Sequence, residues 1–325
     1  MQEIVNNIFS VTSVDFEALA ISIFKYQYKQ NEVYRRWVDA LKIDPAGILH
    51  INEIPFLPVS FFKYEKVICG DENVEVVFTS SGTTQSVNSQ HFVKDASLYT
   101  SSFTKGFQQF YGDVHDWCII GLLPSYLERQ GSSLVTMVDE LIKQSAHPDS
   151  GVYLYDFQKL ADVLTRLESA GQKTLIIGVT FALLDFSEQF PMRLRHTTIM
   201  ETGGMKGRKR EMIRKEVHQL LQQRLGVKTI HSEYGMTELL SQAYSAGDGI
   251  FKTVPWTKVL PRSEDDPQDV SITGRGILNV IDLANVYSCS FIATDDVGMV
   301  FDDGSFEVSG RMDASDIRGC SLLAL

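Results

Sequence analysis

The chain has 325 residues, 44% of them hydrophobic, which is enough for a core in one large α/β domain with attachments or in two domains of ordinary size. Its 30 Lys and Arg residues against 41 Asp and Glu residues give a net charge of −11, which argues against nonspecific binding to nucleic acid or anionic lipid surfaces. Residues 1–11 lack the pattern of a signal peptide, and no run of about 18 apolar residues occurs, so we expect a cytoplasmic protein without a membrane span.

The N-terminal part of the chain is predicted to be helical. Apolar residues recur at helical intervals over residues 14–42, and Pro45, Pro55 and Pro58 then interrupt the pattern. We therefore expect residues 1–70 to form a helical N-terminal segment that packs on the core of the protein.

Strands and helices alternate in the middle of the chain. Apolar runs predict strands at 75–79, 118–123, 174–178 and 197–200. Apolar residues at helical spacing predict helices at 134–142 and 213–225, and residues 227–230 lead into Tyr234. This alternation is typical of an α/β protein with a largely parallel sheet flanked by helices. Residues 261–275 are polar and predict a connection into a later, more β-rich part.

Four polar motifs follow one another along the chain, and we expect them just beyond strand ends, where open α/β folds bind ligands. They are Ser80-Ser81-Gly82-Thr83-Thr84, Tyr234-Gly235-Met236-Thr237-Glu238, Thr294-Asp295-Asp296-Val297-Gly298 and Gly310-Arg311-Met312-Asp313. Together they supply the groups that a nucleotide site needs: hydroxyls and flexible backbone for phosphates, Glu238 for Mg²⁺, Asp296 for a ribose and the fixed charge of Arg311.

Each motif also has a purely structural interpretation. Residues 80–84 could form an ordinary turn, and Glu238 could be an exposed carboxylate after a packed aromatic residue. Asp296 could lie in a solvated turn, and Arg311 could form a surface salt bridge. The order of all four motifs is what favours the nucleotide interpretation.

In this order the motifs resemble those of the adenylate-forming superfamily of acyl ligases. Four further segments are similar to the acyl-protein synthetases of bacterial bioluminescence and their relatives, which are related to phenylacetate-CoA ligases. The segments are Leu57-Pro58-Val59-Ser60-Phe61-Phe62-Lys63, residues 124–134, Glu201-Thr202-Gly203-Gly204-Met205-Lys206-Gly207-Arg208 and Ile317-Arg318-Gly319-Cys320. The resemblance therefore spans roughly residues 50 to 325.

The resemblance implies roles for individual residues. ATP would be bound by Ser80, Ser81, Gly82, Thr83, Thr84, Gly203, Gly204, Tyr234, Gly235, Thr237, Asp296 and Arg311, and Mg²⁺ by Glu238. The acyl group would contact Ser125, Tyr126, Gly131 and Ser132. Lys206 and Arg208 would stabilise charge during adenylation, and Cys320 would accept the acyl group as a thioester. The bland alternative for Cys320 is an inert, buried small residue.

The resemblance also implies an organisation of the chain. Residues 71–309 would form the ATP- and acyl-binding core, and residues 310–325 a hinge-like motif and C-terminal tail, without a full C-terminal lid domain. No lysine follows Arg311, where such a lid would carry one, and Gln85 follows Thr84, where the superfamily usually has a lysine or glycine downstream.

The predicted function is therefore the ATP- and Mg²⁺-dependent activation of a carboxylic acid, expected to be a fatty acid, to an acyl-adenylate. Transfer to Cys320 and on to a partner acyl reductase, acyltransferase or acyl carrier protein would follow. Two alternatives stay open: an aryl- or acyl-CoA ligase similar to phenylacetate-CoA ligase, and a non-catalytic nucleotide- or acyl-binding protein.

Overall fold

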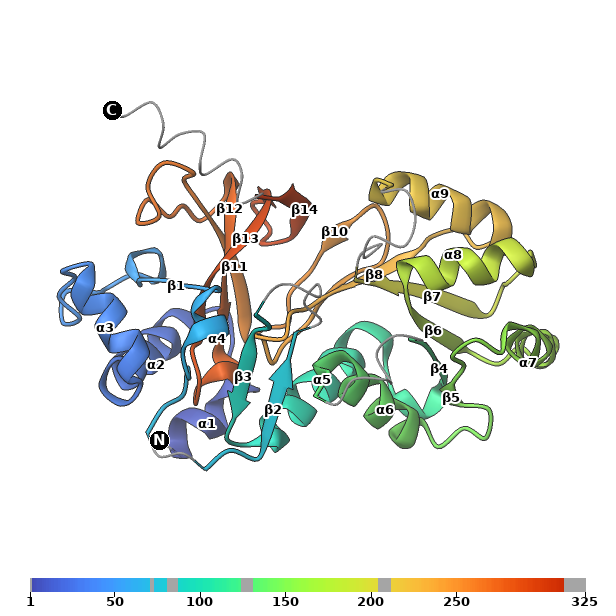
Figure 1. The fold of residues 1–325 in the computed structure, drawn as a ribbon, viewed down its shortest axis with the longest axis horizontal. Coiled ribbons are helices and arrows are strands. Elements are labelled where there is room, and N and C mark those ends of the chain that lie inside the picture. Colours follow the sequence, from blue (N-terminus) through green and yellow to red (C-terminus); the bar gives the residue numbers. More distant parts are fainter. Residues whose placement is uncertain (1, 71–72, 81–86, 124–130, 204–211, 313–325) are drawn as a thin grey trace. The chain divides into compact units, whose positions relative to one another are not determined.

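The computed structural model describes residues 2–70, 73–80, 87–123, 131–203 and 212–312. The chain divides into two compact units, one made of Met1–Glu72 with Pro255–Leu325 and the other of Asn73–Val254. The boundaries predicted from the sequence lie after residues 70 and 309. The structure instead groups the N-terminal segment with the C-terminal part of the chain. Figure 1 shows the elements of both units, which are described separately below.

The unit of residues 73–254 is built on a sheet with strand order β5-β4-β6-β7-β8-β9. Its strands are β4 Cys118–Leu122, β5 Gly151–Val152, β6 Thr174–Val179, β7 Thr197–Thr202, β8 His231–Tyr234 and β9 Ala243–Ser245. The first five strands in this order pair in parallel, and β9 pairs antiparallel with β8. All residues of β4 and β6 are buried, as expected for strands covered on both faces.

In the described part of this unit, five α-helices flank the sheet: α5 Ala96–Tyr111, α6 Ser133–Ser145, α7 Phe157–Ala170, α8 Thr180–Gln189 and α9 Arg214–Leu225. Helices α8 and α9 lie together along one side of the sheet, and α5 and α6 lie on the other side (Figure 1). A short 3₁₀ helix, η2 Val114–Asp116, precedes β4, and the short strand β10 is Ile250–Phe251. A separate hairpin pairs β2 Val76–Thr79 with β3 Gln90–Val93.

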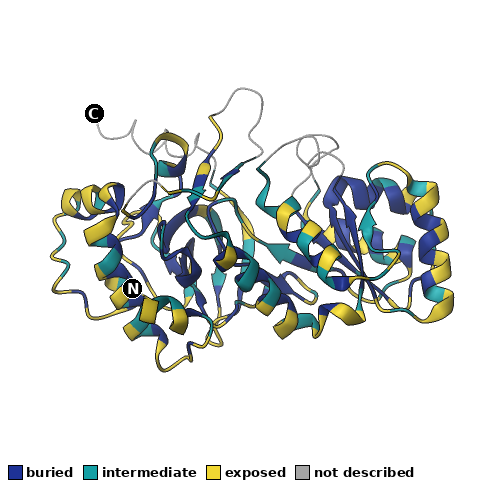
Figure 2. Ribbon diagram, turned by 90° about the horizontal axis from the view of Figure 1, so that it is seen from below, coloured by how far each residue is buried: buried dark blue, intermediate teal, exposed yellow. Residues whose placement is uncertain are grey.

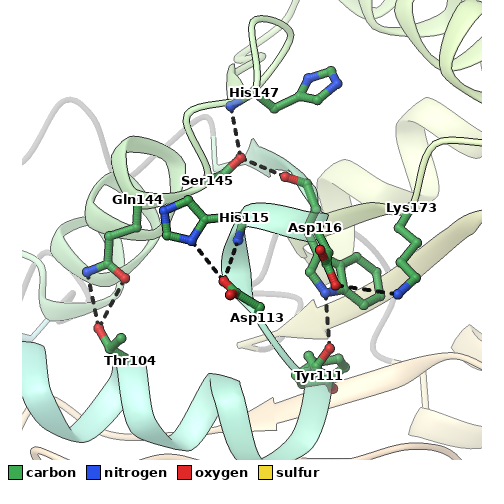
Figure 3. Close-up of polar contacts among 10 residues, drawn as sticks. Thr104, Tyr111, Asp113, His115, Asp116, Gln144, Ser145, His147 and Lys173 are labelled. Atoms are coloured by element: carbon green, nitrogen blue, oxygen red, sulfur yellow. Dashed lines mark hydrogen bonds and ion pairs between the residues drawn. The ribbon is translucent and has the colours of Figure 1, made fainter.

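Polar contacts hold the amino ends of β4 and β6 (Figure 3). Gln144 of α6 donates a hydrogen bond of 3.1 Å to the hydroxyl of Thr104 on α5, and Lys173 lies 3.7 Å from Asp116. The Ser145 hydroxyl donates to the carbonyl oxygen of Trp117, immediately before β4, over 2.6 Å. These contacts fasten the amino edge of the sheet, whereas Gly203 and Gly235 follow the carboxyl ends of β7 and β8.

The second unit combines N-terminal helices with an antiparallel sheet of order β14-β13-β12-β11 and with β1 parallel to β13. The helices are α1 Gln2–Ile8, α2 Phe16–Gln30, α3 Glu32–Ala40 and α4 Phe61–Tyr64, with 3₁₀ helices η1 Ile51–Glu53 and η3 Leu283–Asn285. The strands are β1 Leu57–Pro58, β11 Thr257–Arg262, β12 Gly274–Asp282, β13 Phe291–Val300 and β14 Phe306–Arg311. Most strand residues of the two larger sheets are buried, residues 309–311 at the end of β14 are exposed, and the helices expose their outward faces (Figure 2).

Buried side chains fasten helix α2 to the segment before β13. The Gln27 amide nitrogen donates to the carbonyl oxygens of Asn285 and Val286, each over 3.0 Å, and its amide oxygen accepts from Ser290 N–H. Asn31 caps α3 by accepting from Tyr34 N–H and also donates to the Ser288 carbonyl. The helical N-terminal segment therefore packs against residues 285–290.

One sequence prediction needs adjustment. The helical stretch 14–42 is two helices, α2 and α3, because Asn31 has an extended backbone and caps the second helix. Residues 227–230 lead to a strand that begins at His231. No described helix is long and apolar enough to cross a membrane.

Candidate functional site

The β2–β3 hairpin supports the first predicted phosphate-binding motif. Ser80 directly follows β2, and its backbone N–H donates to the Ser89 carbonyl over 3.0 Å. The Ser80 hydroxyl oxygen accepts from Ser89 N–H over 2.8 Å, so this side chain closes the base of the connection between the two strands. The remaining residues of the motif, Ser81, Gly82, Thr83 and Thr84, lie outside the described residues.

Gly131 and Ser132, two of the predicted acyl contacts, adjoin the same hairpin. Thr79 N–H donates to the Gly131 carbonyl over 2.8 Å. Gly131 has φ +86°, and a Cβ there would lie 3.0 Å from the Val77 carbonyl oxygen, so glycine permits both the conformation and the approach. The Ser132 hydroxyl caps α6 by accepting from Val135 N–H. Ser125 and Tyr126 lie outside the described residues.

The Tyr234–Glu238 motif begins at the carboxyl end of β8. The Tyr234 ring packs against Phe251 with ring centroids 5.8 Å apart. Thr237 and Glu238 occupy a turn that is closed by a 3.2 Å hydrogen bond from Leu239 N–H to the Met236 carbonyl. Glu238 is only 6% exposed, so the interpretation of this residue as an exposed carboxylate is wrong.

A buried histidine links the hairpin to this turn. His91 of β3 is fully buried, and its Nδ1 lies 2.9 Å from the carbonyl oxygen of Thr237. A carbonyl oxygen accepts, so Nδ1 carries the proton. Burial lowers the pKa of His91 to about 4, against the opposing effect of the Thr237 contact, and the ring is therefore neutral near pH 7. The hairpin that contains Ser80 is thus tied to the turn that contains Glu238.

Two carboxylates on neighbouring strands stand at this carboxyl edge of the sheet, one on each face. On one face the Ser232 hydroxyl of β8 donates a hydrogen bond of 3.0 Å to the Glu201 carboxylate of β7. On the other face the Thr202 hydroxyl donates to Glu233 over 2.5 Å.

Glu201 is the centre of a buried polar network next to Gly203. The Thr180 hydroxyl lies 2.9 Å from a Glu201 oxygen and 2.7 Å from the Gly203 carbonyl oxygen. Arg214 Nε and His218 Nε2 of α9 each lie 3.5 Å from Glu201 Oε1. Burial raises the pKa of Glu201, but His218, Arg214 and Thr180 outweigh that effect and hold the pKa below its ordinary value. Glu201 therefore carries a negative charge, and Thr180 is the residue that contacts both Glu201 and the Gly203 carbonyl oxygen.

Glu233 has the opposite electrostatic character. Burial raises its pKa to about 7, the Thr202 hydroxyl lowers it in part, and the charge of Glu201 raises it further. Its carboxyl group lies against Gly235, where an added Cβ would meet Glu233 Oε1 at 2.4 Å. Close to neutral pH this carboxyl group is therefore protonated in some molecules and ionised in the others.

In the other unit, Asp296 and Arg311 face each other across β13 and β14. They are register partners, and Arg311 Nε lies 3.8 Å from Asp296 Oδ1. Their placement inside paired strands corrects the prediction that all four motifs lie beyond strand ends. The neighbouring Asp295 lies beside the same arginine, with a 3.9 Å contact. The salt bridge expected from the structural interpretation is thus present, and it joins the two residues predicted to contact the ribose.

Gly204, Lys206, Arg208 and Cys320 lie outside the described residues. The side chains of Cys69, Cys118 and Cys289 are buried. Burial raises the pKa of Cys118 to about 11 and of Cys289 to about 12, so neither is a reactive thiolate near pH 7.

Sequence reasoning missed His91, Thr180 and the separate roles of Glu201 and Glu233. A signal was available for Glu201, because it directly follows the predicted strand 197–200. No such signal marked His91, whose contact joins residues that are 146 positions apart.

The donor set around the turn agrees with a magnesium ion that is held mostly by a nucleotide. Among the described residues, no group of three or more His, Cys, Asp or Glu side chains is arranged to hold a metal ion. Magnesium typically binds through one or two carboxylates together with substrate phosphates, and Glu238 offers one buried carboxylate.

Comparison with known proteins indicates the same family that the sequence motifs predict. The family model described as "Acyl-protein synthetase, LuxE" matches residues 12–324. The chain is 24% identical over 334 residues to the long-chain-fatty-acid--luciferin-component ligase of Aliivibrio fischeri, in a match that covers 94% of this chain and 86% of that protein.

Solved structures share the fold of this chain. The chain is similar to a 2-hydroxyisobutyryl-CoA ligase in complex with R3-HIB-AMP, with a TM-score of 0.64, 11% identity and coverage of 95% of this chain and 70% of that chain. It is also similar to ATP-bound MatB from Rhodopseudomonas palustris, with a TM-score of 0.55, 18% identity and coverage of 74% of this chain and 49% of that chain. The match thus spans about half the length of MatB. The α/β fold expected from the sequence is confirmed.

Proposed function

The chain belongs to the acyl-protein synthetase family, and from this premise we propose that it activates a fatty acid with ATP and transfers the acyl group to Cys320. The relative from Aliivibrio fischeri, named as a long-chain-fatty-acid ligase, supports a fatty acid as the substrate. The solved ligases bound to ATP or to an acyl-AMP compound support the use of ATP.

The proposed reaction has two steps. In the first, an oxygen of the fatty acid carboxylate bonds to the α-phosphorus of ATP, and the bond to pyrophosphate breaks. In the second, the Cys320 thiolate bonds to the acyl carbon and AMP leaves with the electron pair of the broken bond. AMP is a far better leaving group than oxide, which explains why the acid must be activated before thiol attack.

The observation that carries the proposal is the 2.9 Å contact between His91 and the Thr237 carbonyl. It joins the hairpin containing residues 80–84, which we propose to bind phosphates, to the turn containing Thr237 and Glu238. A hydroxyl and a buried carboxylate on neighbouring residues of the turn, Thr237 and Glu238, suit a triphosphate and its cation.

Magnesium would be held by Glu238 and by the phosphates, and when bound it would withdraw charge from the phosphate oxygens. We assign Tyr234 to adenine stacking, Asp296 and Arg311 to the ribose, and Lys206 and Arg208 to charge stabilisation. Gly131 and Ser132 would border the acyl group together with Ser125 and Tyr126. A partner acyl reductase, acyltransferase or acyl carrier protein would accept the acyl group from Cys320.

Intact-mass spectrometry tests the proposal. The protein is incubated with ATP, Mg²⁺ and fatty acids of different chain length, beside a Cys320→Ser variant, and pyrophosphate release is measured in parallel. We expect a hydroxylamine-labile acyl adduct on the wild-type protein, no adduct on the variant, and pyrophosphate release by both. Cys69→Ser provides a matched control, because Cys69 is buried and should not affect the adduct.

Two outcomes would contradict the proposal. Pyrophosphate release without an adduct would indicate another acceptor, such as coenzyme A. The absence of both signals with every acid would leave a binding protein without catalytic activity.

A further inference from the structure

We infer that His91 is a positioning residue that sets the orientation of the peptide between Thr237 and Glu238, and thereby the affinity for Mg²⁺-ATP. The inference rests on the proposed function, because Thr237 and Glu238 matter to ATP only if the chain binds it. Nothing in the family comparison or in the sequence motifs assigns a role to His91.

The backbone around the two residues explains why one hydrogen bond has this effect. The Leu239 N–H to Met236 carbonyl bond makes Thr237 and Glu238 the two central residues of a four-residue turn. The two common types of such a turn differ mainly by a flip of the central peptide, whose carbonyl belongs to the first central residue, here Thr237. A donor fixed opposite that carbonyl stabilises one of the two orientations.

His91 is suited to hold this donor in place. It is fully buried, it lies on a strand that is paired residue by residue with β2, and its direct partner across the hairpin is the buried Phe78. The ring therefore has little freedom to follow the carbonyl if the peptide turns. A flip would leave the Thr237 carbonyl without its buried donor, which is costly.

The same peptide connects the two side chains that we assign to the phosphates and to the cation. A flip would redirect the Glu238 N–H and shift the start of both side chains. Loss of the His91 donor should thus weaken binding of ATP with Mg²⁺ more than binding of ATP alone, because Glu238 acts through the cation.

Two substitutions separate the hydrogen bond from the volume of the ring. His91→Asn places an amide N–H at the same number of bonds from Cα as Nδ1–H, whereas His91→Leu has no donor. Ser102→Ala is the matched control. The Ser102 hydroxyl makes a buried 2.9 Å contact with Ser241, which follows the turn in the chain. Circular dichroism and thermal unfolding show whether each variant is folded.

The test is calorimetric binding of the ATP analogue with a methylene bridge between the α and β phosphates, with and without Mg²⁺. We expect His91→Leu to weaken binding in Mg²⁺ about tenfold and binding without Mg²⁺ about twofold, which corresponds to the loss of one buried hydrogen bond. His91→Asn and Ser102→Ala should bind within about twofold of wild type. Equal binding by His91→Leu and wild type, or equal losses in His91→Leu and His91→Asn, would overturn the inference while the proposed function stands.

A second readout uses the protein without nucleotide. Nitrogen-15 NMR of the imidazole groups should show the His91 proton on Nδ1 at neutral pH. A proton on Nε2 would exclude donation to Thr237 and overturn the inference. A wild-type protein that does not bind the analogue at all would contradict the proposed function and this inference together.

Discussion

Asp296 and Arg311 occupy paired positions on β13 and β14, and the Arg311 guanidinium lies between two carboxylates, 3.8 Å from Asp296 and 3.9 Å from Asp295. The two carboxylates differ in exposure: the Asp296 side chain is 17% exposed and that of Asp295 is 54% exposed. The adjacent acidic residues therefore have different environments, which makes them distinguishable by experiment.

We predict that Asp296→Asn raises the KM for ATP about tenfold, because an amide replaces a charged acceptor for the ribose hydroxyls. Asp295→Asn is the matched control and should change it by about twofold or less, since exposed ion pairs contribute little. The measurement is pyrophosphate release at varied ATP concentration. A larger effect from Asp295→Asn would show that the assignment of the ribose contact to Asp296 is wrong.

Gly298 should be required for the pairing of β13 with β14. An alanine Cβ there would lie 2.0 Å from the Glu307 carbonyl oxygen and 3.0 Å from Leu278 Cδ1, so the strands would have to move apart. We expect Gly298→Ala to lower the free energy of unfolding by about 2 kcal/mol or more. Gly310 lies on the partner strand with nothing within 4 Å of an added Cβ, so Gly310→Ala should be nearly neutral in the same denaturant titration.

Glu233 should make the stability of the protein depend on pH near neutrality. Its pKa is about 7 in the folded protein and 4.5 in the unfolded chain, so the folded state binds more protons between these values. The free energy of unfolding should therefore fall as the pH rises from about 4.5 to about 7, and remain lower above that range.

Replacing the carboxyl group removes this dependence. Glu233→Gln should be more stable than the wild type at pH 8 by about 1 kcal/mol or more, and the difference should disappear or reverse at pH 5. Thermal unfolding at the two pH values measures it. An identical pH dependence in variant and wild type would show that the carboxyl group is already ionised well below pH 7.

Glu201 should affect stability in the opposite pH range. Its folded pKa is below the ordinary value, so the stabilisation is complete above about 4.5 and is lost as the pH falls through the folded pKa. Glu201→Gln should lower the free energy of unfolding by about 2 kcal/mol at pH 7, because Arg214 and His218 lose a buried partner. The exposed Glu216→Gln on α9 serves as the control and should change stability by less than about 0.5 kcal/mol. A loss of similar size in both variants would contradict a special role for the Glu201 network.

Much of the fold could be predicted from the sequence, because local patterns determine local structure. Buried strands such as β4 and β6 are short continuous apolar runs, and helices α6 and α9 carry apolar residues at helical spacing. The polar motifs together with four further segments were enough to predict the family, since such a resemblance depends on residue types and not on contacts.

The tertiary structure decided which of those motif residues are buried and what each one touches. Ser80 accepts from Ser89, Glu238 is buried, and Asp296 lies within a strand, none of which follows from residue type. His91 meets Thr237, and Glu201 meets Arg214 and His218, only after strands and helices have packed. The sequence by itself thus determined the elements and the chemical groups available, through periodicity and composition. The contacts that set pKa values and backbone orientation depend on distant residues brought together by folding, and only the structure could define them.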